Sequence, residues 1–100
     1  MLNDAGISVF CGVASGTFMS EYIVKIEDKG ETLWQGAVDK EMVFDLRKAP
    51  QEGKFVEGRV YGYLISFDQN SAIVELPVEN VGGRRVCVPL GMVRKEKVPA

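Results

Sequence analysis

The stretch FVEGRVYGYLISF, residues 55–67, decides the fold of this chain. Read with a period of two, it places one set of side chains on one side, Val60, Gly62, Leu64 and Ser66, and a second set on the other, Arg59, Tyr61, Tyr63, Ile65 and Phe67. Such alternation indicates a β-strand, and glycines within the run would let that strand coil sharply. We therefore expect the bent strand with which a small barrel turns a corner.

Short strands separated by turn residues follow this segment. Residues 68–71 supply a turn, and residues 72–76 read as the returning partner strand. Residues 85–88 form a further short strand. Residues 89–91 fit a tight or 3₁₀ corner before a last strand at 92–94.

The preceding part of the chain has the same character. Residues 21–27 and 31–38 alternate as strands on either side of the turn Asp28-Lys29-Gly30, which predicts a hairpin. Residues 39–49 fit either a strand or a helix, and we favour a strand that ends near Leu46.

Strands of about five residues with turns every ~8–12 residues predict an all-β, closed or nearly closed antiparallel barrel with at most a short helical or 3₁₀ turn. The 100 residues fit a single domain. We expect the barrel over residues 19–95 and a frayed tail at 96–100. Residues 1–18, which glycine and serine interrupt, are expected to be a peripheral extension or an edge strand.

Residues 57–94 resemble the SH3-like barrels, including the Tudor-type and KOW-type modules. The resemblance rests on the glycine-flanked bent strand, the polar hairpin turn, the returning Ala-Ile-Val-Glu-Leu-Pro strand and the late corner. It implies a small SH3-like barrel, and because these barrels bind peptides, RNA or modified side chains, it implies a binding module without naming the ligand.

Two further resemblances identify no functional residue in this chain. The type II plasmid-encoded dihydrofolate reductases share the layout and carry Val-Gln-Ile-Tyr in the penultimate strand. Residues 86–89 here read Val-Cys-Val-Pro, so no reductase site residue is carried over. In general look the chain also resembles the short products of bacterial mobile gene cassettes.

Composition narrows the class of protein. The chain is 46% hydrophobic and 26% charged, as in ordinary globular domains. No run approaches the ~18 apolar residues of a membrane-spanning helix. The apolar residues 7–14 follow Asp4 instead of a basic region and precede no convincing cleavage site, so we expect a cytoplasmic protein with no membrane partner.

The chemistry-bearing residues do not predict an enzyme. The chain contains no histidine, which removes the usual general base and the commonest metal ligand. Cys87 lies beside Arg85 but lacks a base partner, and its Val-Cys-Val setting favours a buried structural thiol; we expect Cys11 and Cys87 both to be reduced. The carboxylates follow no pairing pattern. We therefore expect no catalytic residue, no metal site and no cofactor.

The second face of the bent strand is the main ligand-binding candidate, with Arg59, Tyr61, Tyr63 and Phe67. If this face points outward, its rings form an aromatic strip suited to a peptide, a methylated cation or stacked bases. If it points inward, the rings belong to the core. We favour the core interpretation, because a barrel of this size needs large apolar side chains inside.

A second candidate is a basic edge late in the chain. Up to Asn80 there are seven basic and thirteen acidic residues, whereas afterwards five basic residues face only Glu96. Arg84, Arg85, Arg94 and Lys95 could form an edge for an anion or a nucleic acid, and Gly82-Gly83-Arg84 could hold an anion. An uneven solvated surface is the favoured alternative. The isoelectric point of about 5.1 argues against a dedicated nucleic-acid binder.

Self-association is a further expectation, because small barrels often complete their burial by pairing. Trp34, Met42, Phe44 and the first segment could form a homodimer surface. The sequence thus favours a non-enzymatic binding or interaction module for a protein or peptide ligand. The alternatives are a nucleic-acid binder that uses the basic C-terminal edge and an enzyme whose pocket forms between subunits.

Overall fold

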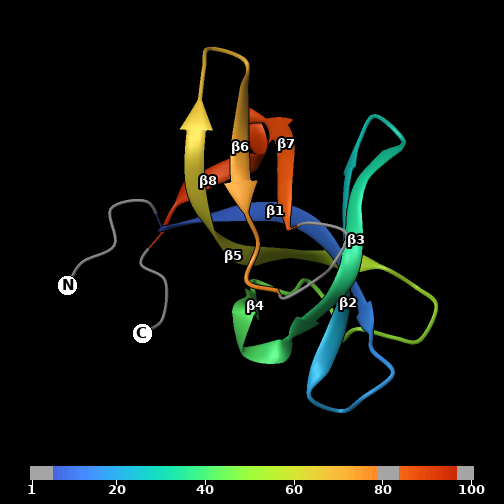
Figure 1. Cartoon of the computed structure of the whole chain (residues 1–100). Coiled ribbons are helices and arrows are strands. Elements are labelled where there is room, and N and C mark those ends of the chain that lie inside the picture. Colours follow the sequence, from blue (N-terminus) through green and yellow to red (C-terminus); the bar gives the residue numbers. More distant parts are fainter. Residues whose placement is uncertain (1–5, 79–83, 97–100) are drawn as a thin grey trace.

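The computed structural model describes residues 6–78 and 84–96 and folds them into a small, nearly closed antiparallel β-barrel (Figure 1). Two short 3₁₀ turns, Lys40–Met42 and Leu90–Met92, interrupt the strands. The strands are β1 (Gly6–Ser15), β2 (Glu21–Asp28), β3 (Glu31–Asp39), β4 (Val43–Phe44), β5 (Val56–Phe67), β6 (Ser71–Glu75), β7 (Arg85–Pro89) and β8 (Val93–Lys95). The predicted fold class, a small all-β barrel, is confirmed.

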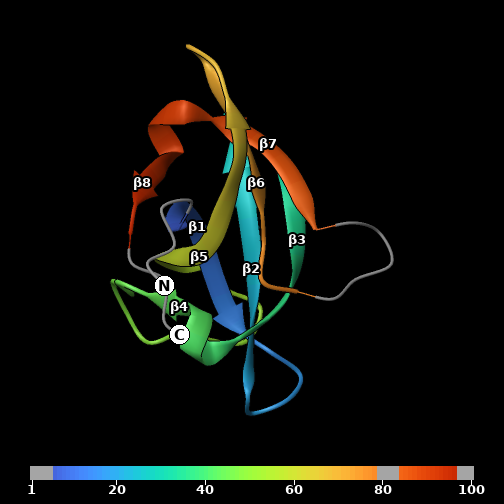
Figure 2. The ribbon, with the colours of Figure 1, turned by 60° about the vertical axis from the view of Figure 1, so that its left-hand side comes forward.

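The sheet runs in the order β3-β2-β1-β5-β6-β7, with β4 added to β5 and β8 added to β1. The sheet curls until its two end strands, β3 and β7, lie against each other (Figure 2). Every pairing is antiparallel in the described part of the chain. The curled sheet gives one inner face, on which the core is built.

The first strand is central to the barrel, which corrects our expectation of a peripheral extension or an edge strand. β1 pairs with β5 from Gly6↔Tyr63 to Val13↔Val56, while its opposite edge pairs with β2 and β8. Its side chains Ile7, Val9 and Val13 are buried. Residues 1–5 and 97–100 of the predicted extension and tail lie outside the described residues, whereas Glu96 is bonded through its backbone N–H to the carbonyl of Gly6.

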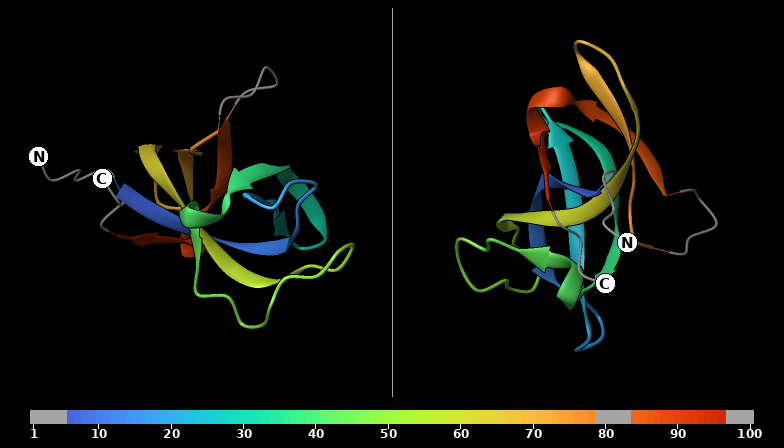
Figure 3. Two further views of the ribbon diagram at one scale, coloured as in Figure 1. Left: turned by 90° about the horizontal axis from the view of Figure 1, so that it is seen from below. Right: turned by 90° about the vertical axis from the view of Figure 1, so that its left-hand side faces the viewer.

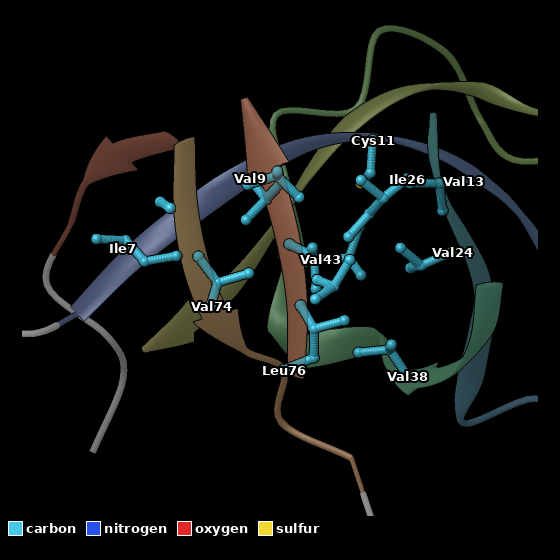
Figure 4. Packing of buried hydrophobic residues seen from close by; sticks show 14 residues of the cluster. Ile7, Val9, Cys11, Val13, Val24, Ile26, Val38, Val43, Val74 and Leu76 are labelled. Carbon is cyan, nitrogen blue, oxygen red and sulfur yellow. The ribbon is translucent and has the colours of Figure 1, made fainter. Parts of the chain in front are cut away.

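The core consists mainly of branched aliphatic side chains from the inner faces of β1, β2, β5, β6 and β7 (Figure 4). Trp34 is half-buried on the inner face of β3 opposite Ile26, and it packs against this cluster. A Cβ added at Gly36 would lie 2.8 Å from two carbons of the Trp34 ring. The missing side chain of Gly36 therefore makes room for the indole.

The connection after β3 differs from the predicted strand that ends near Leu46. The chain makes the 3₁₀ turn Lys40–Met42 and then only two strand residues, Val43 and Phe44. Asp45 follows with a φ of 54°, a left-handed conformation that cannot continue a strand. The predicted 3₁₀ corner near residues 89–91 is present at Leu90–Met92. Within the described ranges, no helix has the length and apolar character needed to cross a bilayer.

Candidate ligand-binding surface

The predicted aromatic face of β5 points away from the core as far as Tyr63. Val60 and Gly62 are buried, whereas the alternating residues Arg59, Tyr61 and Tyr63 are half-buried on the outer side. The core interpretation of these rings is therefore wrong. Small and branched side chains already fill the interior, which leaves the larger rings outside.

Phe67 does not share that face. The pairing of β5 with β6 passes from Leu64↔Val74 to Ser66↔Ile73, so Ile65 is an extra residue in a β-bulge. A bulge shifts the alternation by one residue, and beyond it Phe67 stands opposite the buried Ala72. Phe67 thus follows the inner face and lies 67% exposed at the projecting hairpin. The structure does not bring it together with Tyr61 and Tyr63.

Arg59 is held in a polar network between β5, β1 and the second 3₁₀ turn. Its Nε donates to Ser8 Oγ at 2.7 Å, and its Nη2 donates to the carbonyl oxygens of Ser8 and Met92 at 3.2 and 3.0 Å. Ser8 Oγ in turn donates to Glu96 Oε2 at 3.0 Å. Partial burial, and then the nearby charge of Arg94, lower the pKa of Arg59. Through these hydrogen bonds, Arg59 links β5 to β1 and to the second 3₁₀ turn.

Arg94 forms the next part of this network. It bonds to Glu96 through Nε and to Asp45 Oδ2 through Nη2 at 3.1 Å, and these two carboxylates raise its pKa, Glu96 first. The guanidinium lies 5.7 Å from the ring centre of Phe44, whose ring stacks on Tyr61 at 4.3 Å. The charge of Arg94 is therefore compensated within the chain.

The predicted basic edge is not brought together as one patch. Arg84 and Arg85 both lie against Glu75, at 3.6 and 3.2 Å, at the start of β7. Arg94 and the exposed Lys95 lie on β8, and β1, β5 and β6 separate these strands in the pairing order. Gly82 and Gly83 of the predicted anion site lie outside the described residues.

The two cysteines are free and differ in burial. Val86 and Val88 point inward, so the alternation of β7 places Cys87 outside and exposed, and the predicted buried thiol is wrong. Cys11 is buried, and burial raises its pKa to about 12, while Arg59 partly opposes this shift.

Sequence reasoning missed a hollowed surface among the described residues. Three adjoining open hollows of about 430, 210 and 330 Å³ lie around the outer side of β1 and β5 and the loop between β4 and β5. That loop projects from the side of the barrel (Figure 3). Glu57 lines all three hollows, and Phe10 lines the first two. We call the surface that the hollows share the Phe10 face.

Phe10 is the central apolar group of this face. It stands on the outer side of β1 opposite Arg59, and it is 42% exposed. Beside it, Phe55 covers Gly12, where an added Cβ would lie 3.2 Å from Phe55 Cβ. Lys25 Nζ lies 4.3 Å from the centre of the Phe55 ring. The signal available in the sequence was the ring of Phe10 on the side of β1 that otherwise carries Ser8 and Gly12.

Comparison of the chain with protein-family models, curated proteins and solved structures gave no match. Within residues 6–78 and 84–96, no three cysteine or carboxylate side chains gather as metal ligands would. The assignment of a role therefore rests on the geometry of the Phe10 face.

Proposed function

We propose that this chain is a non-enzymatic binding module that holds an extended peptide segment of a partner protein on the Phe10 face. The observation that carries the proposal is the half-exposed Phe10 ring at the junction of two open hollows. Full burial of a large apolar side chain stabilises a complex by roughly 1.5–3 kcal/mol, and here part of that burial is left for a ligand to complete.

A peptide fits this face better than a nucleic acid does. The bases that line the hollows are interspersed with the carboxylates of Glu27, Asp45 and Glu57, whereas a nucleic-acid surface usually presents a continuous basic stripe. In the basic edge that would serve a nucleic acid, Arg84 and Arg85 share the carboxylate of Glu75, and Arg94 is paired with Asp45. Apolar and mixed polar groups around one ring are instead typical of the centre of a protein interface.

The proposal includes a cytoplasmic location and a homodimer. Two free thiols, one of them exposed, support a reducing compartment. The residues expected to pair two copies are occupied within one chain, because Trp34 and Met42 pack on the core and Phe44 stacks on Tyr61. Other side chains support the homodimer instead, namely Ile65, Phe67 and Ile73, exposed on the β5–β6 hairpin. Sedimentation equilibrium of Phe67→Ser against the unchanged chain tests this.

Selection from a displayed library of random dodecapeptides tests the binding function. We expect peptides that bind the immobilised chain and lose most of their affinity for the Phe10→Ser variant, measured by fluorescence anisotropy. Phe18→Ser is the matched control, because Phe18 is 68% exposed in the β1–β2 loop and lines none of the hollows. Selected peptides that bind Phe10→Ser as well as the unchanged chain would contradict the proposal.

A further inference from the structure

We infer that the partner segment is acidic, an inference that rests on the proposed function and names the chemistry of its ligand. The residues that line the three hollows include five bases, Lys25, Arg47, Lys48, Lys54 and Arg59, and three carboxylates, Glu27, Asp45 and Glu57. The whole chain has a net charge of −2. The Phe10 face is therefore a basic surface on an acidic protein.

The carboxylates of this face are partly neutralised. Glu27 lies 3.7 Å from Lys25, and Asp45 lies 3.1 Å from Arg94. In contrast, Arg47, Lys48 and Lys54 are exposed, and in the described part of the chain no carboxylate lies within 4.0 Å of their charged atoms. On the Phe10 face, the bases without a carboxylate partner are thus concentrated in the loop between β4 and β5.

The backbone of this loop is hydrogen-bonded near its start and at its middle, which holds the loop beside the hollows. Arg47 N–H donates to the carbonyl of Glu57 at 3.0 Å. On the other side, the N–H and hydroxyl of Ser15 donate to the carbonyls of Gln51 and Pro50, at 3.1 and 3.2 Å. A ligand therefore meets a loop whose backbone is already held in place, which lowers the entropic cost of binding.

An extended peptide with an apolar residue and neighbouring carboxylates is complementary both to the Phe10 ring and to the exposed bases of the loop between β4 and β5. The apolar residue would pack on Phe10, and the carboxylates would lie over Lys48 and Lys54. Because these bases are exposed, their attraction is screened over about 8–10 Å at 0.1–0.15 M salt. Affinity for such a peptide should consequently fall as salt rises.

The experiment is the composition of the peptides selected from the random library, followed by their affinity for two charge variants. We expect enrichment of aspartate and glutamate next to an apolar residue. Lys48→Gln combined with Lys54→Gln should weaken binding roughly 2- to 30-fold at low salt, as expected for the loss of two exposed ion pairs. Lys29→Asn combined with Lys40→Gln removes the same charge outside the hollows and should leave the affinity unchanged.

The outcomes separate the two proposals. Selected peptides that are uncharged and still require Phe10 would overturn the acidic ligand and leave the binding function intact. A library that yields no binder, or only binders indifferent to Phe10→Ser, would overturn both. Binding of single-stranded oligothymidine that depends on Lys48 and Lys54 would overturn the peptide in favour of a nucleic acid.

Discussion

Arg59 on β5 donates from Nε to the hydroxyl of Ser8 on β1, and the two atoms lie 2.7 Å apart. Ser8 is fully buried, and the same guanidinium also reaches the carbonyl of Met92 at 3.0 Å. One side chain thus satisfies polar groups from two other segments of the barrel. Such a group is costly to remove, because the buried Ser8 loses its hydrogen bonds to the guanidinium and does not regain water.

Replacement of Arg59 by methionine tests how much these hydrogen bonds stabilise the fold. The variant keeps the aliphatic stem but leaves the carbonyls of Ser8 and Met92 without their donor, and we expect a loss of about 1–3 kcal/mol in the free energy of unfolding. Urea denaturation measures the loss. Ser8→Ala, which removes only the hydroxyl, should cost less. A methionine variant as stable as the unchanged chain would show that water replaces the guanidinium.

Gly62 should not tolerate alanine. A Cβ at this position would lie 2.8 Å from the backbone oxygen of Glu75, so β6 or β5 would have to shift. Overpacking of this kind costs roughly 1–3 kcal/mol, which thermal or urea unfolding would detect. Gly91→Ala is the control, because nothing lies within 4 Å of its added Cβ. Equal stabilities of the two variants would rule out this close approach.

The two thiols should react at very different rates. Cys87 is exposed on β7, whereas Cys11 is buried and burial raises its pKa to about 12. Because the thiolate is the nucleophile, a disulfide reagent at neutral pH should modify one thiol of the folded chain rapidly and the second only after denaturation. Cys87→Ser should abolish the rapid phase, and Cys11→Ser should leave it unchanged. A rapid phase that survives Cys87→Ser would contradict this assignment.

The turn between β5 and β6 should make stability depend on acidic pH. Asp68 Oδ1 accepts the N–H groups of Asn70 and Ser71 at 2.8 and 2.9 Å, and these bonds lower its pKa, Asn70 first. A carboxylate with a lowered pKa stabilises the fold above its unfolded-state value of about 3.9, and this stabilisation is lost as the pH falls through the folded-state pKa.

Asp68→Ala should therefore have a lower Tm than the unchanged chain at neutral pH, and the difference should shrink in strong acid. Asp68→Asn keeps an acceptor oxygen without the charge, so its Tm should lie between the other two and vary less with acid. Calorimetry across the acidic range measures all three. A difference between Asp68→Ala and the unchanged chain that stays constant with pH would exclude the carboxylate as its source.

Local alternation was sufficient to predict most strands, because a half-buried strand carries its own period of two. The same rule misplaced Phe67, since the bulge at Ile65 depends on pairing with β6 and leaves no mark in β5 itself. It also misjudged Cys87, where two valines take the inner positions and leave the thiol outside. In both cases the pairing with the neighbouring strand determines which side chains point inward, and the sequence of the single strand does not.

The candidate surface was predicted only in part, for a related reason. Arg59 stood out in the sequence, but its partners Ser8 and Met92 come from segments that only the fold brings near it. Phe10 became visible as a surface ring only once β1 was placed at the centre of the sheet. Long-range pairing, which no local period encodes, assembled this face.

Because β1 pairs with β8, the barrel cannot be completed during synthesis until β8 has been made. Ile7, Ser8 and Val9 pair on one edge with β5 and on the other with Lys95, Arg94 and Val93. A growing chain that has not yet released β8 therefore exposes an apolar strand with one edge open, which is a template for aggregation. Such long-range pairing also slows folding. Only when β8 has been synthesised is the second edge of β1 covered, and this template for aggregation is then removed.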